Sequence, residues 1–148
     1  MNRIIVFDLD ETLVHATKEK LKIKEDYRYE AFYVYKRPGI IEFLKKCEEY
    51  YKIAIWSSAE DEYVNSIVDN VLRTEMDFEF VWGRSECWMK IIKKEDELGL
   101  KYKEYQNIKP LEKIRRKGYS MDNLLIIDDS PYKVCLLYTS PSPRDMWT

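Results

Sequence analysis

Four short apolar runs recur along this 148-residue chain, and they constrain its fold more than any other feature. They are Ile4–Phe7, Lys52–Trp56, Phe78–Trp82 and Leu124–Ile127. The runs are rich in β-branched and aromatic residues and do not alternate with polar ones, which is typical of strands buried on both faces of a parallel sheet. Because parallel strands need crossover connections, we expect helices between them.

The segments between these runs supply helical patterns. Apolar residues at helical spacing predict an amphipathic helix over 40–50. A second helix is predicted to open at Ser57-Ser58, because Tyr63, Ile67 and Val71 follow every four residues. A third, short helix is predicted from Pro110 to Lys117. The order of elements predicts an α/β fold with a central parallel sheet flanked by helices.

Two segments depart from this alternation. Residues 15–36 are charged and aromatic with partial alternation, which predicts a hairpin or flap inserted after the first strand and ended by Arg37-Pro38-Gly39. Residues 83–107 are charged and aromatic without a clear period, and we interpret them as an insertion or long loop.

Charge and cysteine content exclude several classes of protein. The formal net charge is −2 and no basic block dominates, so direct nucleic-acid binding is not expected. Three widely spaced cysteines without a Cys-x-x-Cys pair indicate neither a disulfide framework nor a zinc knuckle. The apolar run near the amino terminus is too short for a signal peptide or membrane span. We therefore expect an intracellular protein of the nucleus or cytoplasm, without a membrane segment and monomeric.

Polar residues follow the predicted strands at their carboxyl ends. Asp8 and Asp10 follow the first strand, Ser57 the second, and the pair Asp128-Asp129 the fourth. Lys109 precedes the last predicted helix and can reach the same edge. Since open α/β sheets bind ligands beyond the carboxyl ends of their strands, we expect these side chains to form one site.

The residue types favour phosphoryl transfer. Asp8 and Asp10 are two residues apart in extended backbone and can face one ligand, and neighbouring carboxylates resist double ionisation, so one can attack while the other carries a proton. A third carboxylate at Asp128 calls for a hard cation such as Mg²⁺. Positive charge and hydrogen bonds for the phosphate would come from a further set of side chains: Lys109, Thr12 and Ser57.

At this point the chain resembles a known family. Residues 8–12 (DLDET) look like the first motif of haloacid-dehalogenase-type phosphatases, a Rossmann-like fold, and specifically the FCP/SCP-type, NLI-interacting-factor-like branch that acts on the RNA polymerase II C-terminal domain. Residues 55–59, with Tyr63 at the family spacing, resemble the second motif. Residues 109–111 resemble the third motif and 128–131 the fourth. The resemblance runs from about residue 3 to about residue 134.

The resemblance implies a magnesium-dependent protein serine/threonine phosphatase with a phosphorylated protein or peptide as substrate. Asp8 would attack phosphorus to give an aspartyl-phosphate, and Asp10 would protonate the leaving oxygen and then activate water. Mg²⁺ would be held by Asp8, by the backbone carbonyl of Asp10 and by Asp128, with Asp129 as a further candidate ligand.

Other interpretations stay open. A lone Asp-x-Asp is usually a turn, and Ser57 is also suited to cap a helix. The same fold supports small-molecule phosphatases, and a catalytically inactive scaffold is a further alternative. Other phosphatase chemistries are disfavoured, because no Cys-x5-Arg loop is present and His15 is the single histidine.

The carboxyl-terminal sequence differs from the resembling family, whose members continue with another strand and closing helices. Residues 135–148 are polar and punctuated by proline, a pattern that does not extend a sheet. We therefore expect a phosphatase domain over 1–134, incomplete at its carboxyl end, and a non-native or disordered tail over 135–148.

Overall fold

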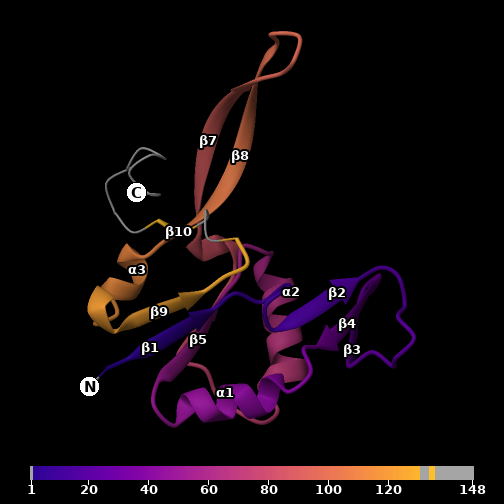
Figure 1. Cartoon of the computed structure of the whole chain (residues 1–148), viewed down its shortest axis with the longest axis vertical. Helices are drawn as coiled ribbons and strands as arrows, with labels where there is room; N and C mark the ends of the chain where they lie inside the picture. The colour runs from indigo at the N-terminus through magenta and orange to yellow at the C-terminus, as the bar shows by residue number, and fades with distance from the viewer. Residues whose placement is uncertain (1, 131–133, 136–148) are drawn as a thin grey trace.

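The fold is built on a four-stranded parallel sheet (Figure 1). The structure is a computed structural model, and it describes residues 2–130 and 134–135. Its strands are β1 (Ile4–Phe7), β5 (Lys52–Trp56), β6 (Val81–Trp82) and β9 (Leu124–Ile127), in the order β6-β5-β1-β9. The predicted α/β fold with a central parallel sheet is confirmed. The third strand is shorter than predicted: only Val81 and Trp82 form regular ladder pairs with β5, although Glu79 and Phe80 also hydrogen-bond to β5 through their backbones.

Helices cover both faces of this sheet. Ile5 and Phe7 point to one face and join a core that includes residues of α1 (Ile40–Glu48) and α2 (Asp61–Ile67). A π-helical turn over Val68–Leu72 continues α2. The alternate residues of β1 point to the other face and pack with Ile114 of α3 (Glu112–Arg115). Burial on both faces explains why the strands read as continuous apolar runs.

A small antiparallel sheet forms the predicted flap. It consists of β2 (Val14–Thr17), β3 (Tyr27–Tyr29) and β4 (Phe32–Lys36), with β4 in the centre. The flap follows β1 directly and lies beside α2 (Figure 1). The expected insertion after the first strand is therefore present as three strands.

The segment 83–107 contains a long β-hairpin. A 3₁₀ turn over Arg84–Glu86 precedes β7 (Trp88–Glu95), which pairs with β8 (Lys101–Pro110). The hairpin projects away from the central sheet (Figure 1). Most of its residues are exposed, so no buried face imposes a period on its sequence.

A two-residue strand, β10 (Val134–Cys135), pairs in parallel with the end of β8, where Cys135 lies opposite Pro110. Cys135, which the sequence assigned to a tail, therefore takes part in a strand pair. The remainder of that predicted tail, 136–148, lies outside the described residues, and so does Pro131 of the fourth motif. The domain boundary stays a prediction.

Two predicted helix starts are wrong. Pro110 ends β8, and α3 begins only at Glu112, because a residue before proline is restricted to extended backbone and Lys109 stays in the strand. The second helix begins at Asp61 after the N-cap Glu60, so Ser57 does not cap it. A 3₁₀ turn over Met121–Asn123 leads into β9. Within the described part of the chain, the helices are too short and too polar to cross a membrane.

Candidate active site

Backbone hydrogen bonds at the carboxyl ends of the strands assemble the site. The amide of Asp8 donates to the carbonyl of Ile127 across 2.9 Å, which places Asp8 beside Asp128. The amide of Ser57 donates to the carbonyl of Trp82 across 2.8 Å, which extends the pairing of β5 and β6 by one residue. Asp8, Ser57 and Asp128 therefore lie at one edge of the sheet, as expected from their places after the strands.

Lys109 bridges two of the carboxylates. Its Nζ lies 3.1 Å from Oδ1 of Asp8 and 2.5 Å from Oδ2 of Asp128. The side chains of Lys109 and Asp128 are only 4% and 1% exposed, so the pair is held away from solvent. Oδ1 of Asp128 also accepts the amide hydrogen of Ser130 at 2.8 Å, which fixes its orientation. A buried ammonium in this place offers fixed positive charge to an anionic ligand.

The environment of Asp8 disfavours its ionised form. Burial, a hydrogen bond with Asp129 and the charge of Asp128 raise its pKa from the ordinary 3.8 to about 7, against the opposing effect of Lys109. The Asp8 side chain is 11% exposed and therefore still reachable from solvent. Bringing a cation near Asp8 would favour the ionised form that a nucleophile needs.

Asp10 is oriented by a residue from the second helix. The hydroxyl of Tyr63 in α2 donates to Oδ1 of Asp10 across 2.7 Å. The Tyr63 ring packs edge-on against Tyr29 and Phe32 of the flap, at centroid distances of 5.3 Å and 6.2 Å. The flap therefore supports the side chain that positions the second aspartate.

A tight turn follows the paired aspartates. Glu11 has a φ of 62°, an uncommon value for a residue with a side chain, and its amide donates to the carbonyl of Val14. The amide of Leu13 donates to the carbonyl of Leu9, so the chain folds back at once into β2. Thr12 is half-buried on this turn, and its hydroxyl has no hydrogen-bond partner among the described residues. Its role in binding phosphate stays a prediction.

The loop after β5 is held from the segment that follows β6. Ser57 is buried, and its Oγ accepts the amide hydrogen of Ala59 at 3.1 Å. Arg84 donates from Nε to the carbonyl of Ser58 at 3.0 Å and from its amide to the carbonyl of Ala59. Gly83 is needed here for space, because a Cβ at this position would lie 2.9 Å from the Cα of Asp61. Residues 83–84 therefore hold the Ser57 loop in place.

The acidic residues fit a hard divalent cation. Carboxylate oxygens of Asp8, Asp128 and Asp129 all lie within 4.8 Å of one another. Lys109 supplies one positive charge against these three carboxylates when they are ionised, and oxygen donors of this kind select Mg²⁺ or a similar ion. Asp10 is not in this side-chain cluster, which is compatible with a contribution from its backbone carbonyl alone.

The motifs and their geometry agree with one family model, that of NLI interacting factor-like phosphatases, which matches residues 3–140. This chain belongs to that family. The phosphatase PSR1 of Saccharomyces cerevisiae is 26% identical over 87% of this chain, and the phosphatase Herzog of Drosophila melanogaster is 25% identical over 98%. The matches cover 28% and 38% of those proteins, so the chain spans well under half of their length.

Solved structures carry the same fold. The RNA polymerase II C-terminal-domain phosphatase Fcp1 of fission yeast, in a variant bound to beryllium fluoride, superposes with a TM-score of 0.57 at 15% identity. A second Fcp1 structure gives a TM-score of 0.58 at 17% identity. Each match covers 90% of this chain and about two fifths of the other. The Rossmann-like fold of this NLI interacting factor-like phosphatase is thereby established.

Asp8, Asp128 and Asp129 lie together, as expected from their places after the strands, but sequence reasoning missed how the site is supported. Tyr63 was recognised by its spacing alone, and nothing in the sequence showed that its hydroxyl bonds to a residue 53 positions away. The roles of Arg84 and Gly83 in fixing the Ser57 loop were likewise missed. Residues 84–87 (RSEC) also resemble the family pattern, and this resemblance was the only sequence signal for the two residues.

Proposed function

We propose that this chain is a magnesium-dependent phosphoprotein phosphatase that acts on phosphoserine or phosphothreonine through an aspartyl-phosphate. The observation that carries the proposal is the set of contacts around Asp8, which lies against Lys109 at 3.1 Å and within a trio of carboxylates. Family membership supports the phosphatase activity.

The reaction divides between the two aspartates. The carboxylate of Asp8 attacks phosphorus, the bond from phosphorus to the serine or threonine oxygen breaks, and Asp10 gives that oxygen its proton. Asp10 then takes a proton from water as the water attacks phosphorus, which returns Asp8 and releases phosphate. The hydrogen bond from Tyr63 holds Asp10 in place for both transfers.

The remaining groups bind the phosphoryl oxygens. Lys109 supplies a buried positive charge, and the hydroxyls of Thr12 and Ser57 supply hydrogen bonds. Mg²⁺ would be held by Asp8, Asp128 and the Asp10 carbonyl, with Asp129 as a further candidate ligand, and would neutralise negative charge on these oxygens.

A protein substrate is favoured by the surroundings of the site. The described insertions are a three-stranded flap and a projecting hairpin rather than a separate cap domain, and this favours an extended peptide over a small molecule as substrate. The solved structures of the same fold are of an RNA polymerase II C-terminal-domain phosphatase, so a phosphorylated peptide from that domain is the first to test.

The decisive experiment is the hydrolysis of a generic aryl phosphate with and without Mg²⁺. Turnover should require Mg²⁺ and be lost in Asp8→Asn, while a phosphoserine peptide should be hydrolysed with a higher kcat/KM than a sugar phosphate. Undiminished turnover by Asp8→Asn would refute the proposed nucleophile, and a preference for the sugar phosphate would refute the substrate class.

A further inference from the structure

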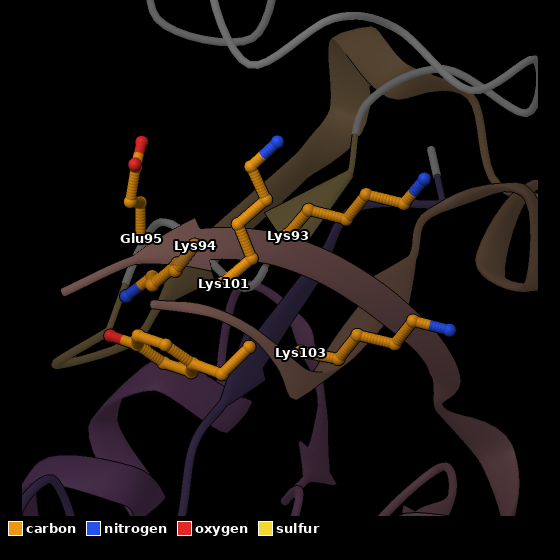
Figure 2. Close-up of a pocket in the computed structure, with 6 residues that line it drawn as sticks. Lys93, Lys94, Glu95, Lys101 and Lys103 are labelled. Carbon is orange, nitrogen blue, oxygen red and sulfur yellow. The ribbon is translucent and has the colours of Figure 1, made fainter. Parts of the chain in front are cut away.

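The β7–β8 hairpin carries lysines that the fold itself does not use. The two strands pair so that Lys93 lies directly opposite Lys103, and Lys101 lies opposite Glu95 on the same face. Figure 2 shows Lys93 and Lys103 extending to the same side, whereas Lys94 extends to the other. Like charges directly opposite each other destabilise a strand pair, so their presence needs another reason.

Some of the other charged groups of the hairpin already have partners. Lys94 pairs with Glu104 at 2.7 Å on the opposite face. Asp96 accepts the amide hydrogens of Leu98 and Leu100 in the turn at the tip. Within residues 2–130 and 134–135, by contrast, none of the three lysines Lys93, Lys101 and Lys103 makes an ion pair within 4.0 Å. These three residues, which we call the lysine face, are exposed and free to bind an external anion.

The lysine face continues toward the active site. On the same side of the ladder the next cross-strand pair is Ile91 and Tyr105, which are 53% and 65% exposed. Met89 and Asn107 follow, and Lys109 lies two residues further along β8. Because side chains in a strand alternate, Lys103 and Lys109 emerge on the same side of β8, although the ribbon twists between them. An apolar strip thus joins the lysine face to the phosphate-binding lysine.

We propose that the lysine face binds acidic side chains of the peptide whose phosphoserine or phosphothreonine occupies the active site. This inference rests on the proposed function. Lys103 and Lys109 are six residues apart on one strand, a separation of about 20 Å. An extended peptide alongside β8 spans that distance in about six residues, so the acidic group lies about six residues from the reacting phosphate.

A peptide fits this surface better than a nucleic acid does. The lysine face holds three positive charges beside Glu95, and the chain as a whole has a net charge of −2, so an extended phosphate backbone would meet repulsion beyond the hairpin. The apolar strip of Ile91, Tyr105 and Met89 offers contacts for peptide side chains between the two anionic groups.

The test compares two phosphoserine peptides of equal length, one with glutamates centred about six residues from the phosphoserine and one with glutamines there. Versions with the glutamates on either side cover both peptide directions. The wild-type chain should show a kcat/KM about three- to tenfold higher for the better glutamate peptide, as expected for a few exposed ion pairs. This preference should disappear in Lys93→Gln/Lys103→Gln and persist in Lys45→Gln/Lys46→Gln, a control with the same charge change on exposed residues of α1.

Two further measurements separate this proposal from the proposed function. Turnover of an aryl phosphate, which is too small to reach the hairpin, should be equal in the wild type and both double variants. Binding of an unphosphorylated glutamate peptide, followed by fluorescence anisotropy, should weaken only in the hairpin variant, and this result does not depend on catalysis. Equal binding by that variant, or tighter binding of a single-stranded oligonucleotide of equal charge, overturns the proposal.

Discussion

The Asp8 carboxyl is buried beside Asp128 and Asp129, and its pKa is raised to about 7, chiefly by burial. A raised pKa means that the folded chain holds a proton that the unfolded chain releases above about pH 4. The contribution of Asp8 to the free energy of unfolding is therefore fully present below pH 3.8, and it is lost as the pH rises to about 7. Its charge state thus links the chemistry of the site to the stability of the fold.

This linkage predicts a pH-dependent effect of Asp8→Asn on stability. Without divalent metal, the variant should gain in melting midpoint over the wild type as the pH rises from about 4 to about 7, because it has no charge to bury. The measurement is a series of thermal melts of both proteins across this range. If the difference in melting midpoint between the two proteins stayed constant with pH, folding would not raise the pKa of Asp8.

Tyr63 offers a second test at the scale of single residues. Tyr63→Phe removes the hydrogen bond to Asp10 and keeps the ring that packs against the flap. A hydrogen bond to a charged group contributes about 1.5–3 kcal/mol, so kcat for an aryl phosphate should fall about tenfold or more. The melting midpoint should change little.

The matched control for that variant is Tyr29→Phe, which removes the hydroxyl of the ring that packs against Tyr63 and leaves the Tyr63–Asp10 hydrogen bond in place. Steady-state kinetics of both variants give the comparison. If Tyr63→Phe and Tyr29→Phe had the same kcat, the hydrogen bond would have no part in positioning Asp10.

Among the elements, the loop after β5 depends on a close approach of two backbone segments. Gly83→Ala would bring a Cβ against Oδ1 of Asp61 and within 2.9 Å of its Cα, and a backbone atom at that distance gives way only if the chain shifts. We expect a loss of about 1–3 kcal/mol in the free energy of unfolding, together with weaker phosphate binding through the displaced Ser57 loop. Chemical denaturation and inhibition by inorganic phosphate measure the two effects.

Gly118→Ala is the control for that substitution. Gly118 has a φ of 104°, and a Cβ added there would meet no atom within 4 Å. Alanine at this position therefore strains the backbone but contacts no residue of the active site. It should lower stability and leave inhibition by phosphate unchanged. Equal loss of phosphate inhibition in both variants would remove the link between Gly83 and the Ser57 loop.

The elements differ in how well their sequences predict them. The strands of the central sheet were predicted because burial on both faces leaves a continuous apolar run, as in Ile4–Phe7. The hairpin was not predicted, because β7 and residues 101–105 of β8 bury no face and their register is set mainly by backbone hydrogen bonds. Pro110 misled the prediction because proline suits both a helix start and the last residue of a strand.

For the molecule as a whole, the position of the site followed from topology. Parallel strands that end in Asp8, Ser57 and Asp128 bring these residues to one edge whatever the details of the loops. Contacts that depend on side-chain direction could not be predicted in this way. The Tyr63–Asp10 hydrogen bond and the packing of the flap on α2 are examples, because they join segments with unrelated sequence patterns.

The measurement that tests the central claim most directly is the location of the covalent phosphoryl group. The protein is mixed with Mg²⁺ and an aryl phosphate, quenched rapidly in acid, digested and analysed by mass spectrometry. We predict a phosphoryl group on Asp8, in greater amount in Asp10→Asn because the water that releases it is then not activated, and none in Asp8→Asn. Turnover with the phosphoryl group on another residue, or without a trapped intermediate in Asp10→Asn, would contradict the proposed mechanism.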